Sequence, residues 1–159
     1  MKITVIAVGK LKEKYWRDAV AEYSKRLGRY VSFAVAEVAD EPSSENASAK
    51  EEEAVRRTEG ERILKRIPAG CFKVALTIDG KRMDSVGFSE WIADRMLRGE
   101  SHIAFIIGGS LGLSEEVIEK ADLKLSFSDF TFPHQLMRVI LAEQIYRAFR
   151  IMKKEPYHK

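Results

Sequence analysis

Two short runs in the last third of the chain, FIIGGSLGL and LSFSDFTFPH, hold the residues whose types best suit binding and catalysis. In the first run an apolar stretch stops at Gly108-Gly109, which is typical of a buried strand followed by a turn. Both runs would expose mainly backbone N–H and C=O groups, which suit a ligand with an apolar aromatic body and a few hydrogen-bonding edges. The Gly108-Gly109 pair alone is a weak signal, because a tight turn without a ligand explains it equally well.

Several other catalytic classes lack their signature residues. A P-loop would need GxxxxGK[ST], and a Rossmann fingerprint would need GxGxxG after the first strand, where the chain has only Gly9. There is no GxSxG nucleophile elbow. Three scattered histidines (His102, His134 and His158) and one cysteine offer no metal-ligand spacing, so no metal ion is expected. The cysteine, Cys71, starts an apolar run and is expected to be a buried structural thiol.

The residues of these two runs must be positioned by regular elements, and strand-like and helix-like patterns alternate along the chain. Strands are predicted at residues 2–8, 31–38, 71–78, 103–107 and 123–127, and helices at 15–27, 48–67, 85–99, 115–120 and 134–152. Ser48 and Glu51 fit a capping box, Ser85 is expected to cap the third helix, and Asp79-Gly80 is expected to end the third strand. This alternation predicts an α/β fold with helices on both faces of a mostly parallel sheet of five to six strands. Loops at neighbouring strand ends would then form the ligand crevice.

The composition is that of one globular domain spanning residues 1–159. The chain is 45% hydrophobic and 32% charged, which excludes a disordered or membrane-spanning protein. The N-terminal apolar run covers only about six residues, too few for a membrane span or a signal peptide. A cytoplasmic location is therefore expected.

The net charge of +3 is unevenly distributed. Residues 1–30 hold eight Lys or Arg against three acids, and residues 134–159 hold six against two. If folding brings these two segments to one surface, they could bind nucleic-acid phosphates, although solvated lysines explain the pattern equally well. The last helix carries apolar residues on almost every side, which predicts a second copy of the chain packed against it.

Motifs spread over the whole chain point to one family. VGKLKEKYW near the start, IDGK after the third strand, FIIGGSLGL, LSFSDFTFPHQLMRVILAEQIYRAFRI and the terminal PYHK occur in this order. In these motifs and in its length the sequence closely resembles the large-subunit rRNA pseudouridine methyltransferase H family, members of the SPOUT class. The resemblance implies a SPOUT-type α/β trefoil knot that forms homodimers. It also implies S-adenosylmethionine as cofactor and N3 of a pseudouridine in 23S rRNA as target, in the large subunit or the assembled ribosome.

The resemblance further implies roles for individual residues. Tyr157 and His158 are the favoured contacts of the target base, because they lie in a tail that resembles the family's C-terminal tail near the active site. His134 is a candidate proton acceptor, because the positive end of a helix disfavours the imidazolium, or it simply begins the last helix. The family's cofactor contacts fall on Leu76, Gly108, Phe127, Ser128, Asp129, Phe130, Thr131 and Phe132.

Two arginines of the last helix have open roles. Arg138 and Arg147 are candidates for contacts with phosphate or the target base. They could equally form ion pairs with Glu143 in a dimer, and Glu143 and Arg147 also have the i,i+4 spacing of a stabilising pair within one helix.

Two other functions compete with a methyltransferase. One is a non-catalytic knotted protein that binds RNA in the ribosome. The other is a doubly wound domain that binds a different nucleotide, such as NAD or ATP. Calorimetry with S-adenosylmethionine separates the first from the enzyme, and a binding screen against NAD and ATP would reveal the second.

Overall fold

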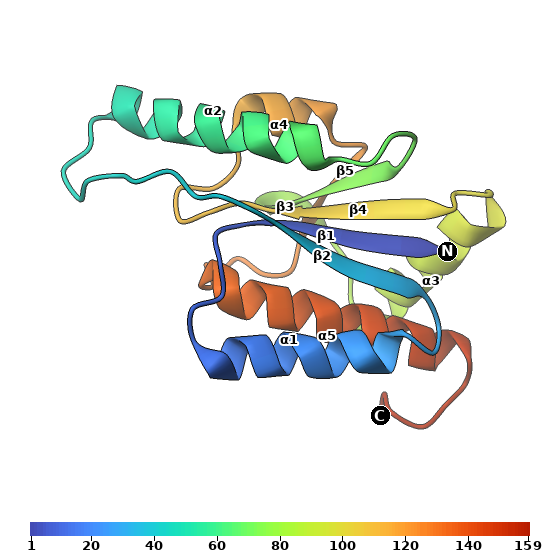
Figure 1. Cartoon of the computed structure of the whole chain (residues 1–159). Coiled ribbons are helices and arrows are strands. Elements are labelled where there is room, and N and C mark those ends of the chain that lie inside the picture. Colours follow the sequence, from blue (N-terminus) through green and yellow to red (C-terminus); the bar gives the residue numbers. More distant parts are fainter.

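Five strands form a single sheet in the order β2-β1-β4-β3-β5, and every neighbouring pair is parallel. The computed structural model describes residues 1–159 (Figure 1). The strands are β1 (Lys2–Val8), β2 (Ser32–Val38), β3 (Phe72–Arg82), β4 (His102–Ile107) and β5 (Leu123–Ser126). The predicted parallel α/β architecture is confirmed with five strands. The trefoil knot stays a prediction.

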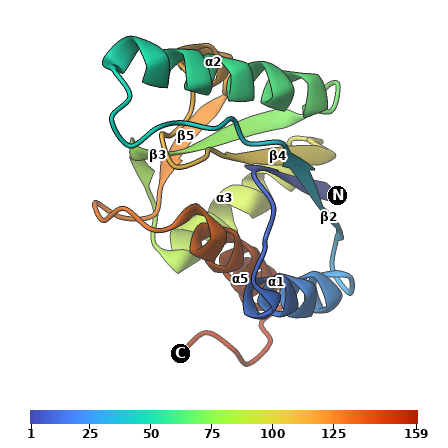
Figure 2. The same ribbon diagram turned by 60° about the vertical axis from the view of Figure 1, so that its left-hand side comes forward.

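Five helices cover the two faces of the sheet. They are α1 (Lys14–Leu27), α2 (Ala49–Arg66), α3 (Ser85–Leu97), α4 (Glu115–Lys120) and α5 (His134–Met152). Helices α1, α3 and α5 lie on one face and α2 and α4 on the other, as Figures 1 and 2 show. None of the helices has both the length and the apolar character that a membrane span requires.

Side chains of β4 alternate between the two faces of the sheet, and each face has its own core. Ile103, Phe105 and Ile107 pack into the cluster shared with α1, α3 and α5, whereas Ala104 and Ile106 pack into the smaller cluster beneath α2 and α4. Because successive side chains of a strand point to opposite faces, a strand covered on both sides reads as a continuous apolar run. This is why the apolar runs of the sequence predict central strands. Cys71 belongs to the smaller core, and its predicted burial is confirmed.

The predicted helix starts are correct in one case and wrong in another. The Ser48 side chain accepts a hydrogen bond from Glu51 N, and the Glu51 carboxylate accepts one from Ser48 N, which confirms the capping box. The prediction that Ser85 caps α3 is wrong. Asp84 is the cap, because its backbone is extended and its carboxylate accepts a hydrogen bond from Gly87 N at 2.7 Å.

Strand β3 does not end at Asp79-Gly80 as predicted. It continues to Arg82, and both Leu76 and Lys81 align with Leu125 of β5, so the intervening residues bulge out of the ladder. Gly80 permits this close approach, because a Cβ there would lie 2.7 Å from backbone atoms of Leu125. The Asp-Gly signal thus marks a bulge inside the strand, after which the pairing resumes.

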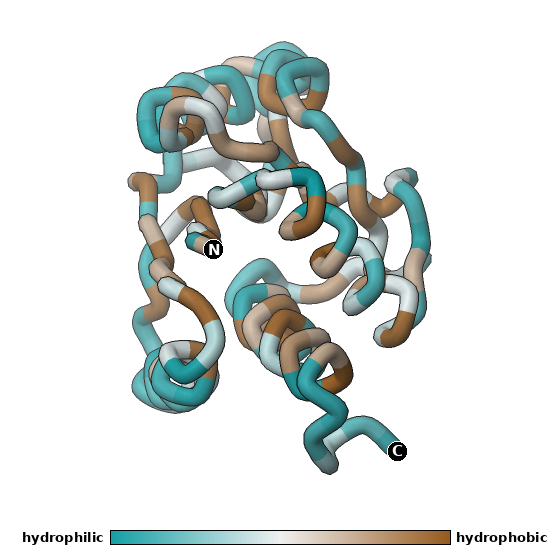
Figure 3. Tube along the Cα trace, turned by 90° about the vertical axis from the view of Figure 1, so that its right-hand side faces the viewer, coloured by the Kyte–Doolittle hydropathy of each residue, from teal (hydrophilic) through white to brown (hydrophobic).

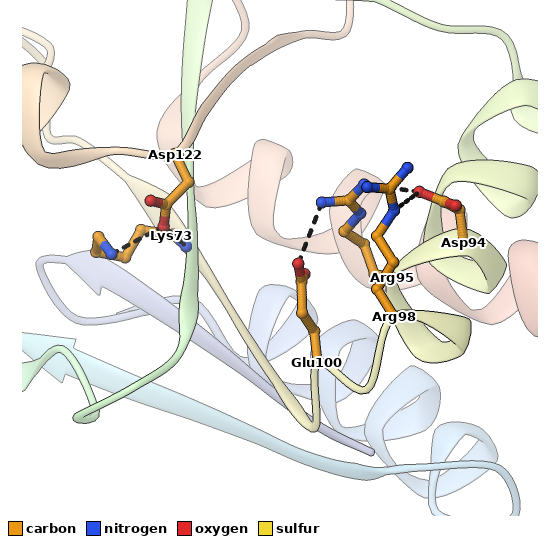
Figure 4. A network of polar contacts seen from close by, with 6 residues as sticks. All are labelled: Lys73, Asp94, Arg95, Arg98, Glu100 and Asp122. Carbon is orange, nitrogen blue, oxygen red and sulfur yellow. Dashed lines mark hydrogen bonds and ion pairs between the residues drawn. The ribbon is translucent and has the colours of Figure 1, made fainter.

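Ion pairs stiffen the amino-terminal edge of the sheet, where strands β3, β4 and β5 begin (Figure 4). Asp122 accepts hydrogen bonds from the backbone N of Lys73 at 2.7 Å and from its Nζ at 2.8 Å. Arg95 of α3 binds Asp94 at 2.6 Å and reaches Glu100, just before β4, at 3.2 Å. These pairs link the start of β5 to the start of β3, and α3 to the segment before β4.

Helix α5 packs between α1 and α3 and joins the two ends of the chain. Tyr146 of α5 lies 6.2 Å from Tyr23 of α1, between ring centroids, so the two basic segments share one layer. Hydrophobic residues recur along the turns of α5, the helix that leads to the C-terminus in Figure 3. Leu136, Val139 and Ile140 remain only half-buried in the single chain, so the apolar surface of α5 is not fully covered.

Candidate functional site

A cavity of about 770 Å³ opens at the carboxyl ends of β3, β4 and β5. It is lined by residues 76–79 of β3, by the turn from Gly108 to Leu113, and by the segment that connects β5 to α5. Because β3 lies between β4 and β5, these segments, far apart in sequence, meet at one edge. Ligands of parallel α/β sheets bind outside the carboxyl ends of the strands, and this volume suits a nucleoside-sized ligand.

The glycine-rich turn forms the backbone wall of the cavity. A Cβ at Gly108 would lie 2.8 Å from the carbonyl carbon of Gly112 and 3.0 Å from Leu113 N, so only glycine fits there. Gly112 has a φ of +83° and donates its N–H to Gly109 O at 3.0 Å, which closes the turn. Backbone donors and acceptors are therefore held at the cavity without side chains in front of them.

The segment after β5 forms the opposite wall and stands away from the sheet in Figure 2. Ser128 Oγ accepts a hydrogen bond from Phe130 N at 3.0 Å, which shapes this loop. Phe127 lines the cavity and also packs against Phe88 of α3 at 6.3 Å between ring centroids, so it serves both the wall and the core. Phe130 is 78% exposed and open to a further contact.

The structure gathers all the predicted cofactor residues around this cavity except one. Leu76, Gly108, Phe127, Ser128, Phe130, Thr131 and Phe132 all belong to the lining. Asp129 does not line the cavity, and its carboxylate instead forms an ion pair with Arg82 at the end of β3. This pair links the loop to the strand beside it.

Three lining residues, Thr77, Ile78 and Asp79, come from the bulge in β3 and were not predicted as site residues. Ile78 is 53% exposed, which is unusual for a large apolar side chain in a strand. The ammonium of Lys124, 3.2 Å from Oδ2 of Asp79, lowers the pKa of this carboxyl group and keeps it ionised. The signal that could have found these residues is the Asp79-Gly80 pair, taken as a bulge beside a ligand site.

His134 begins α5 and lines the cavity, as predicted for a residue at the site. Burial lowers its pKa, and the positive charge of Arg138 lowers it further, so the imidazole is neutral at pH 7. Its Nδ1 has no hydrogen-bond partner within the chain. The expected direction of the pKa shift is confirmed, with burial and Arg138 as its causes. His134 therefore contributes a neutral ring to the cavity wall, with a buried Nδ1 that has no partner in the chain.

Tyr157, His158 and Arg147 form a second cluster that does not line the cavity. The hydroxyl of Tyr157 donates to Glu143 Oε1 at 3.0 Å, and the ring lies 4.7 Å from the guanidinium carbon of Arg147. Burial and the Glu143 carboxylate raise the pKa of Tyr157, so its hydroxyl remains a donor. Arg147 binds Glu143 within the same helix, which confirms the predicted i,i+4 pair. The tail of one chain is thus folded back on its own α5.

The prediction that Arg138 contacts a phosphate or pairs with Glu143 is wrong. Its side chain is 1% exposed and donates to Val8 O at 2.8 Å, to Gly9 O at 2.7 Å and to Glu37 Oε2 at 2.7 Å. Arg138 faces inward because α5 passes beneath the end of β1. It holds the start of the β1–α1 connection in place.

We expect replacement of Arg138 by methionine to lower the free energy of unfolding by about 3 kcal/mol, because methionine fills the space but leaves two carbonyls without donors. Urea denaturation measures the difference. The matched control is Arg57→Met, which removes an exposed i,i+4 pair on α2 and should cost less than about 0.5 kcal/mol. Equal losses for the two variants would contradict the anchoring role of Arg138.

Glu59 of α2 is buried directly behind the glycine turn. The residue is 5% exposed, its Oε1 accepts a hydrogen bond from Glu41 N at 3.1 Å, and its Oε2 has no partner. A Cβ on Gly109 would lie 3.0 Å from Oε2, so the carboxyl group packs against this residue of the turn. Burial raises the pKa of Glu59, and the free oxygen makes the ionised form costly.

We expect Glu59→Gln to stabilise the fold at neutral pH. A carboxyl group whose folded pKa is raised contributes stability at low pH, and this contribution is lost as the pH rises through the folded value. Glutamine keeps the acceptor for Glu41 N without this loss. The free energy of unfolding of the variant should therefore rise relative to that of the wild type as the pH increases from about 4 to about 7. Urea unfolding of both proteins across this range measures the difference. A difference in the free energy of unfolding that does not change with pH would contradict the raised pKa of Glu59.

Comparisons with known proteins agree over the whole chain. The family model described as "Predicted SPOUT methyltransferase" matches residues 1–158. Proteins named ribosomal RNA large subunit methyltransferase H from Bifidobacterium adolescentis, Clostridium kluyveri and Carboxydothermus hydrogenoformans are 58%, 57% and 55% identical, each over 100% of both chains. The fold is similar to that of a probable methylase family protein from Haemophilus influenzae, with a TM-score of 0.55 at 14% identity, covering 99% of this chain and 70% of the other. The chain therefore belongs to the SPOUT family of methyltransferases.

Proposed function

We propose that this protein is a cytoplasmic homodimer that transfers a methyl group from S-adenosylmethionine to N3 of a pseudouridine in large-subunit rRNA. The observation that carries the proposal is the cavity at the carboxyl ends of β3, β4 and β5, walled by Leu76, the Gly108 turn and the loop 127–132. The relatives' names, which include the ribosomal RNA of the large subunit, support this substrate.

The lining of the cavity fits the cofactor. Leu76, Phe127 and Phe132 provide apolar surface for an adenine ring, and the Gly108 turn provides backbone groups that can bond its edges. The close approach of Gly108 to the backbone of Gly112 and Leu113, which any Cβ would prevent, keeps this turn compact at the cavity wall. When bound, S-adenosylmethionine supplies an electrophilic methyl group on a sulfonium.

The chain's own residues then have to hold the target base and take up its imide proton. Methyl transfer is an in-line displacement, so most of the catalysis can come from holding donor and acceptor nitrogen at attack distance. The neutral His134 lies in the cavity lining, and we assign it as a candidate proton acceptor. Tyr157, kept protonated by burial and Glu143, and the exposed His158 are proposed contacts of the target base.

The position of the tail supports the proposal of a homodimer. Tyr157 packs near Glu143, six residues beyond Met137 of the lining, which is about 9 Å along the helix. The tail does not line the cavity of its own chain. A second copy packed against the half-buried Leu136, Val139 and Ile140 of α5 would bring its tail to this cavity, across a twofold axis. Arg147 would then position the tail, with its guanidinium between Glu143 and His158.

The test combines binding and product analysis. Calorimetry with S-adenosylmethionine should show one binding site per chain. Large ribosomal subunits from a strain lacking this protein should accept one labelled methyl group, and mass spectrometry should place it on a pseudouridine. Binding of RNA without binding of S-adenosylmethionine at millimolar concentration would instead indicate a non-catalytic RNA-binding protein.

A further inference from the structure

The segment that joins β1 to α1 carries the first of the sequence motifs, yet no residue of it lines the cavity. We call residues 10–17 the basic arm. It holds four basic residues, Lys10, Lys12, Lys14 and Arg17, against one acid, Glu13. Lys10, Lys12 and Lys14 are exposed, and of these three only Lys14 has an acidic partner within 4 Å, on Asp18.

The backbone of the basic arm is held rigid although its lysines are free. Arg17 donates to Leu11 O at 3.0 Å and also to Lys12 O. Leu11 N donates to Glu37 Oε2 at 3.2 Å, and the same carboxylate oxygen accepts from the buried Arg138. A fixed main chain lowers the entropy lost when a partner binds, so the exposed lysines are presented in advance.

The basic arm starts at the rim of the cavity. A Cβ on Gly9, the residue just before the arm, would lie 3.7 Å from Cε1 of His134, and His134 lines the cavity. In Figure 1 the β1–α1 connection leaves the sheet at the same end as the start of α5. The arm therefore begins beside this side of the cavity.

An aromatic face accompanies these charges. Tyr15 is 64% exposed, and its ring meets Trp16 edge-on with centroids 5.0 Å apart. Exposed aromatic rings beside lysines are the usual platform for single-stranded nucleic acid, because bases stack on the ring while the lysines neutralise phosphates.

We infer that the basic arm binds the unpaired rRNA strand next to the target base, with Lys10 and Lys12 on its phosphates and Tyr15 stacked on a base. This inference rests on the proposed function, since it names the surface that guides the substrate into the same cavity. The basic arm would give this small protein a second surface that binds RNA outside the cavity.

The test measures binding of large ribosomal subunits, from a strain lacking this protein, by co-sedimentation at several salt concentrations. Lys10→Gln/Lys12→Gln should weaken binding about tenfold and make the salt dependence shallower, by about 0.7 in the logarithmic slope for each phosphate that the variant no longer neutralises. Tyr15→Ala should also weaken binding about tenfold but leave the slope unchanged, because stacking is not ionic. Both variants should bind S-adenosylmethionine like the wild type.

The matched control is Lys50→Gln/Lys65→Gln, which removes two exposed lysines from α2 on the other face of the sheet. It should bind the subunits with wild-type affinity and slope. Wild-type affinity and slope for the Lys10 and Lys12 variant would overturn the inference. A Tyr15→Ala protein that becomes monomeric while the wild type is dimeric would also overturn it, because the arm would then be a subunit contact.

Failure of the proposed function would look different. Suppose that binding of ribosomal subunits depends on the basic arm but the wild type transfers no methyl group. This result would support RNA binding by the arm and overturn the proposed methyltransferase activity. Methyl transfer with equal KM in the wild type and the arm variants would support the proposed methyltransferase activity and overturn RNA binding by the basic arm.

Discussion

Replacement of Gly108 by alanine should reduce methyl transfer by about a hundredfold or more, because a displacement of about 1 Å at a reacting site can cost that much. The new Cβ would lie 2.8 Å from the carbonyl carbon of Gly112 and 3.0 Å from Leu113 N. These are backbone atoms, which cannot rotate aside as a flexible side chain would, so the whole turn has to move. We expect affinity for S-adenosylmethionine to fall at least tenfold, and calorimetry measures this directly.

The control for Gly108→Ala is Gly28→Ala, at the end of α1 and outside the lining of the cavity. Gly28 has a φ of −56°, which alanine adopts easily, and a Cβ there would lie 3.3 Å from Lys25 O. This variant should keep cofactor affinity and activity. If Gly108→Ala bound the cofactor as tightly as Gly28→Ala, the turn would not be part of the cofactor site.

Removal of residues 157–159 should abolish methylation while leaving cofactor affinity nearly intact. The truncation takes away the groups proposed to hold the target base, and general acid–base and positioning groups each contribute about 10²–10⁴ in rate. The cavity stays complete, because Tyr157 and His158 are not among its lining residues. Methyl transfer from labelled S-adenosylmethionine and calorimetry separate the two effects. Full activity of the shortened protein would refute the placement of the target site.

The point variant His158→Ala separates chemistry from folding. Truncation also removes the ring of Tyr157 from Tyr146, where the centroids are 4.9 Å apart, and this can cost about 1 kcal/mol of stability. His158 is exposed, so its loss should leave unfolding unchanged and lower only kcat. A loss of activity in the truncated protein alone would place the whole effect on Tyr157 or on folding.

Mixing the two defective proteins tests whether the tail acts on the partner's cavity. A mixed dimer pairs the intact cavity of the tail-less chain with the intact tail of the Gly108→Ala chain. Random exchange of subunits should then restore about a quarter of wild-type activity, since half of the dimers carry one complete site. Activity that stays at zero after exchange would place the tail on the cavity of its own chain.

Much of the site could be predicted from the sequence because local rules and the fold agree there. The run ending at Gly108 forms β4 and the glycine turn, and the loop 127–132 leads into α5 beside it. Parallel strands of alternating α/β units place these segments at one edge, so the crevice follows from the strand order. Only the resemblance to a family could name the ligand.

The misses come from tertiary contacts that a linear pattern does not contain. Arg138 has the spacing of a surface residue, yet the end of β1 lies close enough for its guanidinium to bind Val8 and Gly9. Glu59 lies in a highly charged stretch and is nevertheless buried against the glycine turn. The position of Tyr157 depends on the direction of the chain after α5, which no period of apolar residues fixes.

The pairing of β3 with β5 bears on how this site can change in evolution. Leu76 and Lys81 both align with Leu125, so the four residues between them are framed by two fixed points of the ladder. A residue inserted or deleted inside this frame would not shift the register of the strands on either side. The side wall of the cavity can therefore vary in length and chemistry among descendants of one ancestor while the rest of the sheet is inherited unchanged.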